Sequence, residues 1–287
     1  MCAAGKPEEK DVIVDGLRLH YLDWGGEGQP YMLLLHGGGQ TAHTWDDVAP
    51  ALGGLHHVVA LDQRGHGDSS WAPNGEYSVE AHLGDINGFA QALGMRSFVL
   101  IGLSMGGMNA IAFTATHPRK VRALGIVDVG PDVNPEGVRE IREFTSVDIR
   151  SSFEDFLEAA KKFNKRRTEA NLRHRLSHSL KQLPDGRWTW KQDPAIRDFH
   201  ARPQRPRRDL WADVAKIRCP TTVIRGGESK VLTVEATRKL VAAIPGCRLA
   251  TIPGAGHSVM GDNPRAFEKA VQQFLASIPQ RTTTRRG

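Results

Sequence analysis

The chain has 287 residues, of which 40% are hydrophobic and 24% are charged, and its net charge is +6. This composition is typical of a globular protein with a substantial core, and it excludes a disordered chain or one that needs disulfides or metals to fold. No apolar run approaches the ~18 residues of a membrane span, and residues 1–10 lack the apolar centre of a signal peptide.

The cysteines bear on the cellular compartment of the protein, and the distribution of the basic residues bears on whether it binds nucleic acid. Cys2, Cys219 and Cys247 show no metal-ligand spacing, and an odd number of thiols favours a reducing, cytoplasmic location. Much of the positive charge lies in residues 161–175 and 202–208, without any nucleic-acid-binding motif beside it. We therefore interpret the basic runs as solvated surface and expect no nucleic-acid partner.

The first third of the chain alternates strand patterns with turns and helices. Residues 11–25 are typical of two short strands around the turn pair Asp15-Gly16. "YMLLLHGGG" (31–39) and "HHVVALDQRGHGDS" (56–69) each predict a buried strand that ends in a polar, glycine-containing turn. A helix capped by Ser78 follows, because its apolar residues recur at steps of three and four.

The middle of the chain continues this alternation. "SFVLIG" (97–102) and "ALGIVDVGP" (123–131) predict two more buried strands, and the helix between them has to end before Pro118. Strands that alternate with helices predict an α/β fold with a mainly parallel sheet covered on both faces.

Between about Asp132 and Asp209 the strand pattern stops. "SSFEDFLEAAKKF" (151–163) predicts a helix with a capping box of Ser151 and Glu154, and leucines at four-residue steps in 172–180 predict another. Only "RWTW" (187–190) is ambiguous. We expect a helical cap over residues 132–209 that interrupts the α/β core.

The core resumes after this insertion. "TTVIRGG" and "CRLATIPG" predict the last strands, and a closing helix starts with Asn263 as its cap and Pro264 in its first turn. The sequence therefore predicts a core made of residues 1–131 and 210–279, followed by a flexible tail over 280–287.

The stretch "IGLSMGG" (101–107) carries the strongest functional motif. Gly102, Ser104 and Gly106 fit the pattern G-x-S-x-G, with a strand before and a helix after. In that context the pattern predicts a sharp turn that exposes a nucleophilic serine, and the glycines relieve crowding at the turn. Without that context it would indicate only a glycine-rich turn.

A serine nucleophile also needs backbone N–H groups for the developing oxyanion. The amide of Met105 opens the helix after the serine, where it lacks a partner within the helix. "LHGGG" (35–39) supplies the amide of Gly38 between flanking glycines. We expect these two amides to form the oxyanion hole, whereas the alternative for "LHGGG" is a flexible loop.

The base should be a histidine at the carboxyl edge of the sheet. "IPGAGHSVM" places His257 just after the last predicted strand. His66 in "RGHGDS" is the competitor, but it precedes Ser104, whereas this motif runs serine, acid, histidine along the chain. We therefore expect His257 to be the base and His66 to brace the turn after its strand.

The chain resembles the α/β-hydrolase superfamily in its lid-bearing branch. The matching segments are "LHGGG", "LDQRGHGDS", "IGLSMGG", "GIVDVGP" and "IPGAGHS", in family order, and they cover nearly all of the chain outside the insertion. The resemblance implies a mainly parallel eight-stranded sheet flanked by helices, with the insertion as its cap. It says far less about the substrate.

The triad acid departs from the commonest family pattern. Many relatives place an aspartate three residues past the glycine that follows the penultimate strand, and that position, counted from Gly226, is Ser229 here. Glu228 lies one place out of register. Another family solution puts the acid after the strand that follows the elbow, where this chain has Asp128. We expect Asp128 to be the acid and keep Glu228 as the alternative.

The resemblance implies a serine hydrolase that cleaves carboxylic esters through an acyl-enzyme on Ser104, with no metal or organic cofactor. The alternatives on the same fold are carbon–carbon bond hydrolases, lactonases and cofactor-free haloperoxidases or dioxygenases. A ligand receptor without catalysis is a further alternative from another class. A small-molecule ester is the expected partner, and the sequence predicts no oligomeric state.

The substrate pocket should lie between the cap and the edge of the sheet. Trp45, Trp188 and Trp190 are candidates for its walls, and for each the alternative is ordinary core packing.

Overall fold

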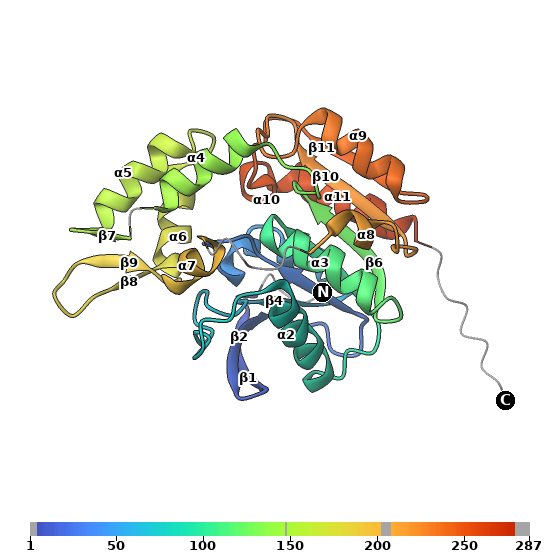
Figure 1. The fold of residues 1–287 in the computed structure, drawn as a ribbon, viewed down its shortest axis with the longest axis horizontal. Helices are drawn as coiled ribbons and strands as arrows, with labels where there is room; N and C mark the ends of the chain where they lie inside the picture. The colour runs from blue at the N-terminus through green and yellow to red at the C-terminus, as the bar shows by residue number, and fades with distance from the viewer. Residues whose placement is uncertain (1–4, 147, 202–207, 279–287) are drawn as a thin grey trace.

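The computed structural model describes residues 5–146, 148–201 and 208–278. Figure 1 shows a sheet covered by helices, with a second group of elements, coloured green to yellow, at one end. We call this second group (residues 135–201) the cap and the remainder the core. The flexible tail predicted for residues 280–287 and most of the basic run 202–208 lie outside the described residues.

The core is built on one eight-stranded sheet with the order β1-β2-β4-β3-β5-β6-β10-β11. All neighbouring pairs from β4 to β11 are parallel, and only β2 runs against the others. This confirms the mainly parallel sheet. The strands are β1 (Glu8–Val14), β2 (Leu17–Asp23), β3 (Tyr31–Leu35), β4 (His57–Leu61), β5 (Phe98–Leu103), β6 (Val121–Val127), β10 (Thr221–Gly226) and β11 (Arg248–Ile252).

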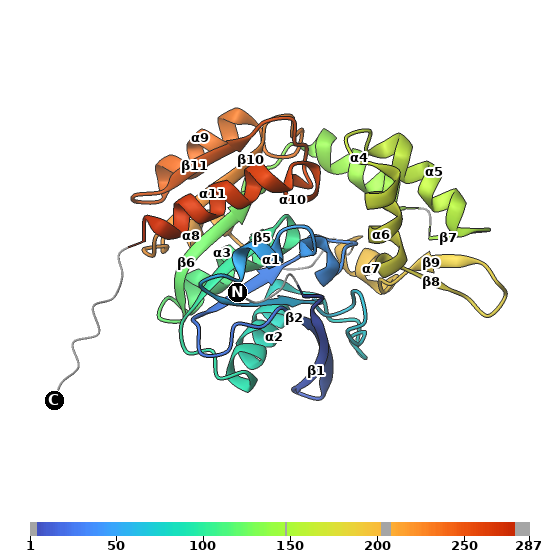
Figure 2. The ribbon, with the colours of Figure 1, turned by 180° about the vertical axis from the view of Figure 1, so that it is seen from behind.

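Helices cover both faces of this sheet, because successive strand residues point to opposite sides. In β3, Leu33 and Leu35 pack into one apolar cluster, whereas Met32 and Leu34 pack into the other. The first face, toward the viewer in Figure 1, carries α2 (Val79–Ala92), α3 (Met105–Thr116), α8 (Leu210–Val214) and α9 (Val234–Ala243). The second face, seen in Figure 2, carries the 3-10 helix η1 (Ala42–Trp45), α1 (Ala49–Leu52), α10 (Val259–Asp262) and α11 (Pro264–Ala276).

The helix boundaries follow the local signals of the sequence. Ser78 Oγ accepts a hydrogen bond from the Ala81 N–H at 3.2 Å, and Asn263 caps α11 with Pro264 in its first turn. The helix after the serine motif ends at Thr116, two residues before Pro118. These three predictions are confirmed, as is the hairpin between β1 and β2, whose turn residues Asp15 and Gly16 have positive φ.

The cap contains a small sheet as well as the expected helices, and the ambiguous segment "RWTW" is part of that sheet. "RWTW" contains a true strand, which pairs on both sides within a three-stranded antiparallel sheet of order β7-β9-β8. The cap elements are α4 (Pro135–Thr145), β7 (Ile149–Arg150), α5 (Phe153–Phe163), α6 (Glu169–Ser179), β8 (Leu180–Gln182), β9 (Trp188–Trp190) and α7 (Ala195–Ala201).

The capping box of α5 lies one residue later than predicted. Ser152 Oγ accepts from the Asp155 N–H, and the Asp155 carboxylate accepts from the Ser152 N–H. Ser151 and Glu154 have the same spacing, but the Glu154 carboxylate instead pairs with Arg173 of α6 at 2.6 and 2.8 Å. The later start directs Phe156, Leu157 and Ala160 into the apolar cluster of the cap.

No helix among the described residues is long and apolar enough to cross a membrane. The cytoplasmic location stays a prediction.

Candidate active site

Ser104 lies in a strained turn between β5 and α3. Its φ of +52° and ψ of −117° belong to a region that non-glycine residues rarely adopt. The flanking glycines are required, because a Cβ at Gly102 would lie 2.2 Å from the Gly106 carbonyl oxygen. The strand, the turn and the helix are therefore those that the G-x-S-x-G motif needs.

Asp128 follows β6, the neighbour of β5, and its carboxylate is completely buried. His257 Nδ1 lies 2.8 Å from Asp128 Oδ2, and we assign its proton to Nδ1 because an ionised carboxylate can only accept. The carboxylate also accepts from the Gly226 N–H at 2.9 Å and from the Ser229 hydroxyl at 2.5 Å. Three donors therefore compensate the burial of this group.

The two alternative positions for the acid have other partners. Ser229, at the place where many relatives keep the aspartate, donates its hydroxyl to Asp128. Glu228 is exposed, and its carboxylate accepts from the guanidinium of Arg166 in the cap at 2.6 and 2.9 Å. The structure thus brings Asp128, and not Glu228, to the imidazole.

The "LHGGG" loop lies against Ser104, and the side chain of Gln40 connects this loop to Ser258, which follows His257. No hydrogen bond between the Ser104 and His257 side chains is found in the described part of the chain. A Cβ at Gly37 would lie 3.2 Å from Ser104 Cβ, so the serine side chain lies close to the backbone of Gly37. The Gly37 N–H donates to Gln40 Oε1 at 3.2 Å, and Gln40 Nε2 donates to the Ser258 hydroxyl at 3.4 Å. Catalytic hydrogen bonds are often long without substrate.

The two expected oxyanion amides lie on facing backbones. The Gly106 N–H donates to the His36 carbonyl at 3.2 Å, which holds the turn of Ser104 against the "LHGGG" loop. A Cβ at Gly38 would lie 4.0 Å from Met105 Sδ. Within residues 5–146, 148–201 and 208–278, neither the Gly38 N–H nor the Met105 N–H has a hydrogen-bond acceptor. Both amides are free to bind an anion.

His66 is buried in the turn after β4 and contacts the cap. Its Nδ1 lies 3.0 Å from the Arg64 carbonyl, and its Nε2 lies 3.2 Å from the side-chain amide of Gln192. Burial, with a smaller effect of nearby His36, lowers the pKa of His66 to about 3. This neutral, fully engaged ring braces the turn, as expected from the sequence.

The tryptophans lie in apolar clusters. Trp45 is fully buried on the second face of the sheet, where its ring packs on Phe267 at 6.1 Å between centroids. We therefore correct the prediction that Trp45 lines the substrate pocket, and the packing alternative holds for it. Trp188 and Trp190 pack within the apolar cluster of the cap.

The buried ion pair of Arg167 and Asp262, which the sequence analysis did not predict, contacts the residues on either side of His257. Arg167 of the cap and Asp262 of α10 are 3% and 1% exposed, and Arg167 Nε lies 2.8 Å from Asp262 Oδ1. Arg167 Nη2 also donates to the carbonyl of Ser258 at 3.1 Å, and Asp262 Oδ2 accepts from the Gly256 N–H at 2.9 Å. The pair thus holds the residues on both sides of the imidazole.

Nothing in the local sequence distinguishes Arg167 from its basic neighbours, because its partner lies 95 residues away. The one signal is Gly261, where a Cβ would lie 2.0 Å from Arg167 Nη2. A glycine inside a short helix is unfavourable unless something packs against it.

Comparisons with known proteins identify the family of this fold. A sequence family described as the alpha/beta hydrolase fold matches residues 30–264. An esterase of Mycobacterium tuberculosis is 33% identical over 262 residues, which cover 88% of this chain and 85% of that protein. The 2-hydroxy-6-oxo-6-(2'-aminophenyl)hexa-2,4-dienoic acid hydrolase of Metapseudomonas resinovorans is 28% identical over 93% of this chain and 91% of its own.

The solved structure of E-2-(acetamidomethylene)succinate hydrolase superposes with a TM-score of 0.85 over 94% of this chain and 100% of that one. At 23% sequence identity this likeness concerns the fold alone. The family match covers both core segments and the cap between them. The chain therefore belongs to the α/β-hydrolase family.

Proposed function

We propose that this hydrolase cleaves carboxylic esters through an acyl-enzyme on Ser104. The observation that carries the proposal is the 2.8 Å hydrogen bond between His257 and the buried Asp128, beside the strained turn that presents Ser104. An aspartate that accepts from the imidazole fixes its tautomer and stabilises the imidazolium formed during reaction. The esterase relative supports esters as the substrate class.

In the proposed mechanism Ser104 Oγ attacks the carbonyl carbon of the ester while His257 Nε2 takes the proton of the Ser104 hydroxyl. The negative oxygen accepts from the amides of Gly38 and Met105. The tetrahedral intermediate collapses, the C–O bond breaks, and the alcohol leaves with the proton that His257 held. Water then attacks the acyl-enzyme with the same base, which releases the acid and restores the serine.

Covalent labelling tests the nucleophile, and a substrate panel tests the reaction. A fluorophosphonate should add one phosphonyl group to the protein by intact mass, and Ser104→Ala should remain unlabelled. Activated esters of short and long acids should all be assayed, because nothing above fixes the acyl length. Labelling of the Ser104→Ala variant would overturn the nucleophile, and absence of turnover on every ester would overturn the ester substrate.

A carbon–carbon bond hydrolase is the second candidate, and the dienoic acid hydrolase relative favours it. The same serine, base and oxyanion hole could act on a carbonyl beside the bond that breaks. A higher kcat/KM on a 2-hydroxy-6-oxo-dienoic acid than on any ester of the panel would select this candidate. Tight binding without turnover of either class would instead support a receptor.

A further inference from the structure

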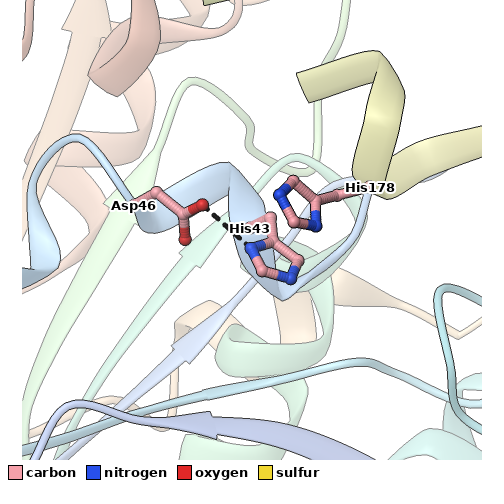
Figure 3. A group of neighbouring side chains, drawn as sticks. All are labelled: His43, Asp46 and His178. Carbon is pink, nitrogen blue, oxygen red and sulfur yellow. Dashed lines mark hydrogen bonds and ion pairs between the residues drawn. The ribbon is translucent and has the colours of Figure 1, made fainter. Parts of the chain in front are cut away.

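A group of histidines around one carboxylate lies where the cap meets the core (Figure 3). His43 belongs to η1, which follows the "LHGGG" loop, and Asp46 comes directly after η1. His178 belongs to α6 of the cap. The rings of His43 and His178 stack with their centroids 3.5 Å apart, and His43 Nδ1 lies 2.8 Å from Asp46 Oδ2. We call His43, Asp46, His174 and His178 the junction cluster.

The spacing of the ligand atoms suits one small cation. A nitrogen or oxygen atom from each of His43, Asp46 and His178 lies within 4.8 Å of the other two. Ligand atoms around a tetrahedral Zn²⁺ are about 3.4 Å apart, since each lies about 2.0–2.2 Å from the metal. Side-chain rotations that move these ligand atoms by about an ångström would therefore bring them to the spacing required around an ion.

The cluster also has unused ligand capacity. Asp46 Oδ1 is buried and has no hydrogen-bond partner. His178 forms no hydrogen bond through either ring nitrogen in the part of the chain that the structure describes. A buried carboxylate oxygen without a donor needs an explanation, and a bound cation would supply one.

A third imidazole lies beside the carboxylate and belongs to the same helix as His178. His174 Nε2 lies 2.8 Å from Asp46 Oδ2, the oxygen that His43 Nδ1 also contacts. His174 and His178 are four residues apart in α6 and so share one helix face, as do the paired histidines of metal-binding helices. Around the cluster, the carboxylates of Asp46, Asp47 and Asp262 lie among the cations Arg167, Arg175 and Lys191.

The chemistry of the donors selects the class of ion. An imidazole binds a metal ion through a ring nitrogen of its neutral form, so the histidines of the cluster offer nitrogen ligands. A set of three imidazoles and one carboxylate suits Zn²⁺, Co²⁺, Ni²⁺ or Cu²⁺ rather than Ca²⁺ or Mg²⁺, which prefer oxygen.

We propose that the junction cluster binds a divalent transition-metal ion of the Zn²⁺ class, which ties helix α6 of the cap to the core. Binding replaces the contacts that His43 and His174 make with Asp46. Because the ion bridges cap and core, it restrains cap opening and slows substrate entry. The site itself does not depend on the proposed function.

Metal binding is tested without any activity. Chelator-treated protein is titrated with Zn²⁺ by calorimetry and with Co²⁺ by visible absorption, and its Tm is measured with and without Zn²⁺. We expect one site, tetrahedral Co²⁺ bands and a higher Tm with Zn²⁺. His178→Gln and Asp46→Asn should each weaken Zn²⁺ binding at least tenfold, whereas His117→Gln, at a histidine outside the cluster, should leave it unchanged. Equal affinity in all four proteins would overturn the site.

A second arm tests the restraint on the cap and separates it from the active site. Zn²⁺ should lower kcat/KM of the unsubstituted enzyme, and His178→Gln should remove most of this inhibition. Equal inhibition of both would show that the ion acts elsewhere, for example on His257, and would overturn the proposed restraint. Ser104→Ala should bind Zn²⁺ as tightly as the unsubstituted protein does, even if the serine mechanism proves wrong.

Discussion

In the core, almost every residue of β3, β4, β5, β6 and β10 is buried, and helices press apolar side chains onto both faces of these strands. The cap instead has a small apolar cluster of its own and reaches the core mainly through polar side chains. These cap-to-core pairs include Arg166–Glu228, Arg167–Asp262, Asn171–Asp47, His174–Asp46 and Lys191–Asp68. One small apolar cluster, around Tyr77 and Phe199, also spans the two parts.

This difference assigns separate tasks to the two parts. Apolar packing fixes the backbone of the core, so it can hold a strained turn at Ser104 and a buried carboxylate at Asp128. Apart from the buried Arg167–Asp262 pair, these polar contacts are exposed or partly exposed. Such contacts are individually weak in water and can break and reform, so they suit a part that admits substrate. Substitutions at Ser104 and Asp128 of the core should therefore lower kcat, and substitutions of the exposed cap contacts should mainly change KM.

The largest effect should come from Ser104→Ala. Removal of the proposed nucleophile should lower kcat by about 10⁶, the size of the loss when the serine of a triad hydrolase is removed. Tm should stay nearly unchanged, because one small, partly exposed hydroxyl is lost and the turn keeps its backbone. Ester turnover and thermal unfolding measure the two effects. Ester turnover that survives in the variant would show that chemistry does not reside in this turn.

Asp128→Asn should come next, with a loss of about 10⁴ in kcat, because the imidazole loses the carboxylate that orients it. Glu228→Gln is the matched control and should change kcat little, since Glu228 contacts the cap. The double variant Asp128→Asn with Ser229→Asp moves the acid to the position common among relatives and should recover part of the loss. A damaging Glu228→Gln beside a mild Asp128→Asn would reverse the assignment.

The same contrast explains what could be predicted from the sequence. The succession of strands and helices and the Ser104 turn could be predicted from apolar runs and glycines. These signals are local, because each is contained in a few consecutive residues. Asp128 could be chosen because Ser229 leaves the usual position without a carboxylate. The small sheet of the cap, the Arg167–Asp262 pair and the burial of Trp45 could not be predicted, because each depends on partners far away in the chain.

Two adjacent arginines provide a test of how the cap is held. Arg167→Met leaves the buried Asp262 carboxylate without its cation, which should lower the free energy of unfolding by about 3–5 kcal/mol. Arg166→Met breaks only the exposed pair with Glu228 and should cost about 0–1 kcal/mol. Denaturant unfolding measures both.

Activity should separate the same two variants, because Arg167 also holds the loop of His257. Arg167→Met should lower kcat under conditions where the protein remains folded, whereas Arg166→Met should act mainly on KM. Arg167→Lys should restore part of the stability, since it keeps the charge. Equal stability and equal kcat in the two methionine variants would mean that the buried pair neither holds the cap nor supports the imidazole.

The smallest effect is the pH dependence of stability that comes from His66. This residue links the turn after β4 to Gln192 of the cap. Its pKa of about 3 in the folded protein lies below the ordinary value of 6.5. Between these two values the unfolded chain binds a proton that the folded chain does not, so folding is favoured fully above pH 6.5 and progressively less as the pH falls toward 3. His66 should therefore make the free energy of unfolding rise by about 1.4 kcal/mol per pH unit in the lower part of this range.

Denaturant unfolding at several values between pH 7 and pH 4 should show a shallower dependence of this free energy on pH for His66→Gln, which cannot titrate, than for the unsubstituted protein. Parallel slopes would mean that the ring becomes protonated without unfolding, and hence that this contact between core and cap opens as readily as the exposed ones.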